Sequence, residues 1–204
     1  KGHRTGMEIR PQGLGRKDGV RVAMADNEKI EVEEAIVEEA VVDSSSGTVR
    51  ELKEHFPDAV LDYQDALSEE TVTVERSAII AVLRFLKDES STPFTRLCDL
   101  TAVDRLYLDE DVRFAVVYHL HSHLSNQRIR IKVPVPESDP VVGSAASVWP
   151  AADWMEREVY DLYGIEFEGH PDLRRLVMPD DFGAHPLRKD YPLHGNGERD
   201  NFAF

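Results

Sequence analysis

Three histidines alternate along one predicted strand and could bind a metal ion. His119, His121 and His123 stand two residues apart in a stretch that begins at Phe114. Side chains at positions i, i+2 and i+4 of a strand point to one face, so the three imidazoles would lie together. Three histidines with a fourth position open for water are a ligand set that zinc accepts in hydrolases. The spacing therefore allows a zinc metalloenzyme, although no carboxylate or distant histidine can be assigned as its partner.

The same histidines have a plainer interpretation. Tyr118 and Leu120 alternate with them and, together with Leu124, would form the buried side of the strand. The histidines would then line a solvated sheet face, and His123 lies where the strand should be ending. Motif matches of this length often fail, so we favour the solvated face and keep the zinc site as the alternative.

A second stretch, near the C-terminal end, is dense in charged, aromatic, Gly and Pro residues. It runs from Trp154 to Pro192 and contains WMEREVYDLYGI at 154–165, GHPDLRRL at 169–176 and HPLRKDYP at 185–192. Pro150 suits a first helical turn and Gly164 suits a helix stop, so residues 151–163 are predicted to form a helix.

The charges of this predicted helix would ordinarily lie in solvent. Met155, Val159, Leu162 and Tyr163 form an apolar stripe at helical spacing. Arg157 and Asp161 stand four residues apart on another face. Residue physics alone therefore predicts one exposed ion pair there, which would contribute a few tenths of a kcal/mol.

The residues after Gly164 predict an extended arm rather than regular structure. Pro171, Pro179, Pro186 and Pro192 interrupt helix and strand alike. The segment nevertheless carries the apolar residues Ile165, Phe167, Leu173, Leu176, Val177, Met178, Phe182, Leu187 and Tyr191. An extended segment with so many apolar residues should lie against something, either its own domain or a neighbouring protein. As a docking arm, it would expose these side chains in the isolated chain and bury them against the neighbour. Arginines in the arm can bind carboxylates or backbone carbonyls at such a contact.

The stretch from Trp154 to Pro192 resembles the signature of the C-subunit (30 kDa) family of proton-pumping NADH:quinone oxidoreductase, respiratory complex I. The residues that match this signature, and that the resemblance implies lie at a partner interface, are Glu156, Arg157, Glu158, Asp161, Gly164, His170, Pro171, Asp172, Arg174, Arg175, Pro186, Arg188, Lys189, Asp190 and Tyr191. A weaker resemblance extends upstream, so that it covers roughly residues 48–193.

The resemblance implies an assembly role without catalytic residues on this chain. Members of the family are described as carrying no flavin, iron–sulfur cluster or quinone of their own; FMN and the clusters that connect NADH to quinone lie on partner subunits. They sit in the peripheral arm and wrap their C-terminal segment over the quinone-binding D subunit, close to the Fe–S subunits. The implied location is the cytoplasmic face of the bacterial inner membrane, reached only through the complex. The same signature occurs in ferredoxin- and hydrogenase-linked membrane complexes, which remain an alternative.

Composition limits the other possibilities. The chain has 204 residues and a net charge of −15, which argues against a general nucleic-acid surface. No run approaches the roughly 18 apolar residues of a membrane-spanning helix. The single cysteine, Cys98, excludes an internal disulfide and is predicted to be a small buried side chain in a strand.

Three parts follow from the composition along the chain. Residues 1–47 form an acidic N-terminal extension of low order, because residues 26–43 hold eight carboxylates against one lysine. Residues 48–163 are expected to form the core domain and residues 164–204 the extended arm, which the resemblance implies is packed on partner subunits.

The core domain is predicted to be α+β. A helix capped by Thr48 leads to a strand pair at 59–61 and 71–74, and a second helix opens at Ser77. Three strands follow, at 94–103, 114–121 and 129–135, with Asp109-Glu110-Asp111 as a polar turn. Because helices precede a run of strands, we expect a largely antiparallel sheet covered by helices on one face, followed by the long extended C-terminal docking segment.

Overall fold

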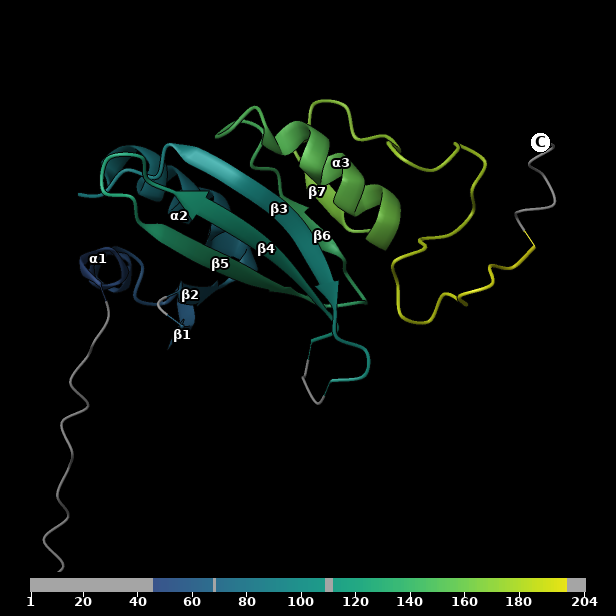
Figure 1. Ribbon diagram of the computed structural model, residues 1–204, viewed down its shortest axis with the longest axis horizontal. Helices are drawn as coiled ribbons and strands as arrows, with labels where there is room; N and C mark the ends of the chain where they lie inside the picture. The colour runs from purple at the N-terminus through teal and green to yellow at the C-terminus, as the bar shows by residue number, and fades with distance from the viewer. Residues whose placement is uncertain (1–45, 68, 109–111, 198–204) are drawn as a thin grey trace, which may run out of the picture. The chain divides into compact units, whose positions relative to one another are not determined.

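A computed structural model describes residues 46–67, 69–108 and 112–197 (Figure 1). The predicted N-terminal extension, apart from its last two residues, and the predicted turn Asp109-Glu110-Asp111 lie outside these ranges. No helix within the described residues has the length and apolar character needed to cross a membrane.

A five-stranded sheet forms the centre of the fold, with the strand order β1-β2-β5-β4-β3. The strands are β1 (Val60–Ala66), β2 (Glu69–Val74), β3 (Arg96–Asp104), β4 (Phe114–His121) and β5 (Arg128–Val135). All neighbours are antiparallel except β2 and β5, which pair in parallel. The predicted α+β class with a mainly antiparallel sheet is confirmed.

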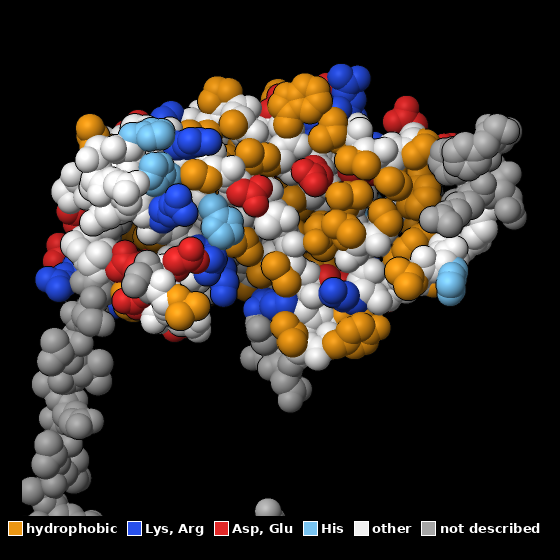
Figure 2. Space-filling model, viewed as in Figure 1, with side chains coloured by type: hydrophobic (Ala, Val, Ile, Leu, Met, Phe, Trp, Pro, Cys, Tyr) orange, Lys and Arg blue, Asp and Glu red, His pale blue; other side chains and the backbone are white. Residues whose placement is uncertain are grey.

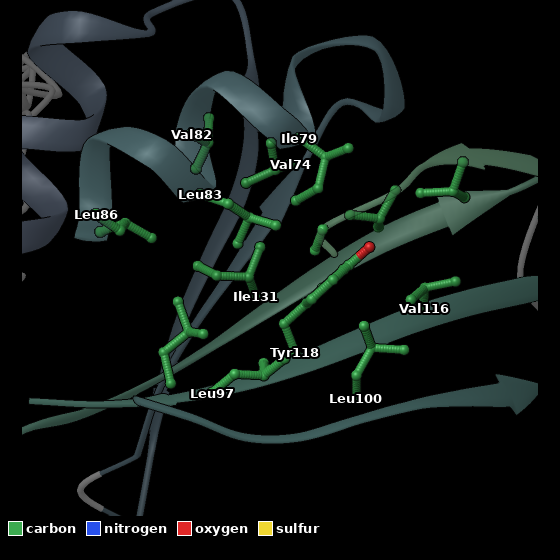
Figure 3. Close-up of a cluster of buried hydrophobic side chains, with 14 of the residues drawn as sticks. Val74, Ile79, Val82, Leu83, Leu86, Leu97, Leu100, Val116, Tyr118 and Ile131 are labelled. Atoms are coloured by element: carbon green, nitrogen blue, oxygen red, sulfur yellow. The ribbon is translucent and has the colours of Figure 1, made fainter. Parts of the chain in front are cut away.

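The two faces of the sheet differ as the alternation in the sequence predicts. Ile129, Ile131, Val133 and Val135 of β5 are buried, while the residues between them point to the other face and are partly exposed. Tyr118 of β4 extends from the buried face into the core, beneath the helix that covers the sheet (Figure 3).

Two helical segments precede β3. The first, α1 (Gly47–His55), begins two residues earlier than predicted, because Ser46 and not Thr48 is its N-cap: the Ser46 hydroxyl accepts the Val49 N–H at 3.4 Å. The second comprises a 3-10 turn (Arg76–Ala78), α2 (Ile79–Arg84) and a π-helical turn (Phe85–Glu89). Its residues Val82, Leu83 and Leu86 pack onto the sheet (Figure 3). The helix predicted to open at Ser77 is confirmed.

The C-terminal part of the core is built around α3 (Ala152–Tyr163), which matches the predicted helix. Two short parallel strands flank it, β6 (Val141–Gly143) and β7 (Glu166–Glu168), and neither was predicted. Ile165 and Phe167 are buried in the core, so the folded domain continues past the predicted boundary at Tyr163. Beyond Glu168, residues 169–197 contain no helix or strand and run as an irregular chain beside α3 (Figure 1).

Cys98 lies in a strand, β3, as predicted, but the prediction that it is buried is wrong, because its side chain is exposed. The pairing of β3 with β4 shifts register between Leu97 and Asp99. Such a bulge places an extra residue in one strand and interrupts the alternation of side chains. Leu97 and Leu100 therefore point into the core, and both residues between them point outward.

Candidate functional site

The three histidines are not gathered into a metal site. β4 ends at His121, so His123 lies beyond the strand and the alternation does not reach it. The ring of His121 contacts that of His123 edge-on, 4.9 Å between centroids, and its Nε2 hydrogen-bonds Asn126 at 3.1 Å. Burial, and then the charge of the paired Arg130, lower the pKa of His119. Within the ranges described, no group of three or more His, Cys, Asp or Glu side chains could hold a metal ion.

The signature residues converge instead on the C-terminal end of α3, where Asp161 is the central acceptor. Its carboxylate is fully buried and forms an ion pair with the Arg175 guanidinium at 2.7 Å. Its second oxygen accepts three consecutive backbone N–H groups, from Leu176, Val177 and Met178, at 2.7–3.0 Å. Burial raises the pKa of this carboxyl, but these hydrogen bonds and the ion pair outweigh it and leave the pKa below its usual value. Asp161 therefore holds the irregular segment against the helix.

The predicted exposed ion pair between Arg157 and Asp161 is wrong. Arg157 is buried, and it donates to the backbone carbonyls of Arg174 and Arg175 at 3.2 Å each. Its guanidinium also lies over the Trp154 ring, 4.9 Å from the centroid. The i, i+4 rule describes isolated helices, and here the irregular segment crosses this face of α3 and provides better acceptors.

Glu156 occupies another side of α3 and ties it to the residues after β6. Its carboxylate, which is fully buried, accepts the Ser144 hydroxyl and the Ala145 N–H, both at 2.6 Å. Burial raises the pKa of Glu156 to about 7, because these two hydrogen bonds compensate the lost hydration only in part. The nearby His170 donates from Nε2 to the Asp153 carbonyl at 3.1 Å, since its Nδ1 accepts a backbone N–H at 3.0 Å.

Gly164 allows the segment to approach the end of α3 closely. It has φ 72°, the left-handed conformation typical of a residue that ends a helix. A Cβ at this position would lie 2.5 Å from the His185 ring and 2.7 Å from the Arg188 guanidinium. Both groups are fixed there: His185 Nδ1 donates to the Asp161 carbonyl at 2.9 Å and Arg188 donates to the Tyr163 carbonyl at 2.6 Å.

A second anchor, which the sequence prediction missed, joins the segment to the end of β3. Asp104 is buried and pairs with Arg113 at 2.9 Å, and it also accepts the Lys189 N–H at 2.8 Å. Arg113 reaches Asp190 as well, at 2.7 Å. Burial would raise the pKa of Asp104, yet the Arg113 guanidinium and the N–H donors lower it. The hairpin register, which pairs Asp104 with Phe114, would have placed Arg113 beside this carboxylate.

The signature residues thus divide into two sets. The inward set, whose side chains bind within this chain, comprises Glu156, Arg157, Asp161, His170, Arg175, Arg188 and Asp190. The outward set, whose side chains are exposed, comprises Glu158, Pro171, Asp172, Arg174 and Lys189. Arg174 and Asp172 of the outward set form an ion pair with each other at the surface. Pro186 and Tyr191 are half-buried. Gly164 belongs to neither set, because its role is to end α3 in the left-handed backbone conformation.

The sequence of the chain matches a known protein family. Residues 72–197 match the family model described as "Respiratory-chain NADH dehydrogenase, 30 Kd subunit". The chain is also 50% identical over 147 residues to the C subunit of the NADH-quinone oxidoreductase of Citrifermentans bemidjiense, covering 72% of this chain and 89% of that protein.

The chain belongs to the respiratory-chain NADH dehydrogenase 30 Kd subunit family.

Two solved structures share the fold of this 30 Kd subunit family member. A trypsin-resistant fragment (1–134) of Nqo5 is 34% identical, with a TM-score of 0.54, and the match covers 61% of this chain and 98% of the fragment. A chain of a membrane-bound sulfane sulfur reductase, an archaeal respiratory membrane complex, gives a TM-score of 0.62 over 76% of this chain and 91% of its own. At 24% identity, this second likeness concerns the fold alone.

Proposed function

We propose that this chain is a cofactor-free structural subunit in the peripheral arm of a proton-translocating NADH:quinone oxidoreductase. The single observation that carries the proposal is the 50% identity to the C subunit of such an enzyme, over nearly all of that protein's length. On this proposal, electrons pass from NADH through FMN and iron–sulfur clusters on other subunits to quinone, and this chain stabilises their arrangement. The chain attaches to the cytoplasmic face of the bacterial inner membrane through the complex.

The proposed partner surface is the C-terminal segment, with the quinone-binding D subunit as its chief partner and the Fe–S subunits nearby. Two properties of the segment support a docking role. It is held in one conformation by the inward set, so little conformational entropy remains to be lost on binding. It also leaves apolar side chains exposed, with Val177 55% and Leu187 47% exposed. A partner that covers these side chains would remove apolar surface from water, which favours association.

The structure also changes one part of the docking-arm hypothesis. Ile165 and Phe167, expected to be exposed in the isolated chain, are buried in its own core. The segment is therefore proposed to fold first on its own domain and to dock with its outer surface only.

Affinity purification tests the proposal. The tagged full-length chain, extracted gently from membranes of its own organism, should carry the other subunits of an NADH:quinone oxidoreductase in equal amounts. The purified single chain should contain no stoichiometric flavin, iron or zinc. Recovery of the chain with a ferredoxin- or hydrogenase-linked complex would assign it to that related assembly instead. One equivalent of zinc, lost on His119→Ala with His121→Ala, would contradict the cofactor-free role.

A further inference from the structure

Exposed apolar side chains concentrate at one place on the molecule, where the C-terminal end of β3 meets the irregular segment. A hollow of about 520 Å³ lies there, which we name the apolar groove; its lining includes Val103, Tyr107, Leu108, Tyr163, Leu187 and Lys189. Val103 is 43% exposed, Tyr107 77% and Leu108 58%. Hydrophobic side chains gather on this face over β3 and α3 (Figure 2).

The two walls of the groove are fixed to each other. Tyr107, in the loop after β3, donates its hydroxyl to the Lys189 carbonyl at 3.3 Å. The Lys189 N–H in turn binds the buried Asp104 carboxylate, which Arg113 also holds. The apolar groove is thus preformed, and binding would not have to lose conformational entropy to order its walls.

Acidic side chains act on one wall of the groove. Besides burial, the charges of Asp104 and Glu158 raise the pKa of the Tyr163 hydroxyl, which lines the groove. Glu158 is exposed on α3, and none of the described residues forms an ion pair with it. Lys189 brings one positive charge to the rim, but its long side chain can extend into solvent. The whole chain carries −15, which further favours a positively charged partner.

We propose that the apolar groove binds an apolar segment of another subunit that carries an Arg or Lys side chain next to Glu158. This inference rests on the proposed function, because it names where and by what chemistry this chain meets a partner. A second copy of this chain is disfavoured, since two chains of −15 repel each other.

Matched substitutions test the groove in the full-length chain. Leu108→Asp places a charge in the groove, and Leu61→Asp makes the same change on β1, where the leucine is 52% exposed. Glu158→Lys reverses the charge beside the groove, and Glu54→Lys does so on the exposed face of α1. We expect Leu108→Asp and Glu158→Lys to lower recovery in the complex at least tenfold. Leu61→Asp and Glu54→Lys should assemble like the unsubstituted chain, and all four should melt within a few degrees of it.

Photo-crosslinking identifies the occupant. With benzoylphenylalanine in place of Leu187 in the purified complex, the crosslink should map to an apolar segment of a different subunit with Arg or Lys within a few residues. The inference is overturned if the crosslink maps to a second copy or to this chain itself, or if the groove variants assemble as well as their controls. Failure of the unsubstituted chain to join any complex would instead reject the proposed function.

Discussion

Asp161 and Arg175 form an ion pair of 2.7 Å that fastens the irregular C-terminal segment to the end of α3. The carboxylate is fully buried and the guanidinium is 17% exposed. In the same segment, Arg174 pairs with Asp172 while both remain more than half exposed. Two adjacent arginines of the family signature therefore have different tasks: one folds the segment and the other lies at its surface.

Removing these arginines should separate the two tasks. Arg175→Ala leaves the buried Asp161 without its cation, and we expect it to lower the free energy of unfolding by about 3 kcal/mol. Arg174→Ala removes only an exposed pair and should change it by less than about 0.5 kcal/mol. Urea unfolding of the isolated chain measures both. Equal effects would show that Asp161 does not hold the segment in solution.

Glu156 should make stability depend on pH between about 4.5 and 7. Burial raises its pKa from 4.5 to about 7, so the folded chain favours the protonated form. The contribution of this group is then complete below pH 4.5 and is lost as pH rises through 7, on the order of 3 kcal/mol in total. Urea unfolding at a series of pH values should show Glu156→Gln gaining stability relative to the unsubstituted chain across this window. A difference that stays constant with pH would contradict the raised pKa.

Asp161 and Asp104 should act in the opposite direction and at lower pH. Their pKa values are lowered below 3.8 in the fold, so the stability they contribute is present above that pH and is lost as pH falls below it. With Asp161→Asn, the free energy of unfolding should therefore decrease less steeply as pH falls below 3.8. The control is Asp172→Asn, an exposed carboxylate of the same segment, which should leave that side unchanged.

Gly164→Ala should loosen the segment around His185 and Arg188. The new Cβ would clash with both side chains, in addition to the cost of a left-handed conformation. Gly169→Ala is the matched control, because Gly169 has φ 83° but no neighbouring atom within 4 Å of the position that a Cβ would take. We expect Gly164→Ala to cost at least about 1 kcal/mol more than Gly169→Ala in urea unfolding. Similar costs for the two variants would indicate that the close approach is absent.

Cys98 should react with thiol reagents in the folded chain. Its side chain is exposed at the bulge of β3, so labelling should need no unfolding. The measurement compares the labelling rate in buffer with that in denaturant, and rates within about tenfold of each other are expected. Labelling only in denaturant would restore the buried position that the strand alternation alone predicted.

Periodicity was sufficient for β5 and insufficient for other strands: β1 (Val60–Ala66) was predicted only over residues 59–61. The alternation of Ile129, Ile131, Val133 and Val135 predicts β5 correctly, because half of a one-sided sheet strand must be apolar. β6 and β7 have three residues each, too few for any period to be visible. The bulge beside Cys98 is a local change of register, which alternation cannot reveal.

The residue types of the site were predictable, but most of their partners were not. The motif from Trp154 to Pro192 drew attention to Asp161 and Arg175, which do meet. The helical spacing rule paired Asp161 with Arg157 instead, because that rule considers only one helix. The actual acceptors of Arg157 are the carbonyls of Arg174 and Arg175, in a chain without regular structure. Only the three-dimensional path of such a chain shows which carbonyls it brings within reach.

Hydroxyl-radical footprinting of the free and the assembled chain tests the central claim most directly, namely that the segment is folded by the inward set and docks with its outer surface. Val177 and Leu187 should be oxidised readily in the free chain and at least fivefold more slowly in the complex, because a partner covers them. Leu61 and Leu124, exposed on other parts of the domain, serve as references and should change little. Equal oxidation of Val177 and Leu187 in both states would contradict the account, because the segment would then form no interface.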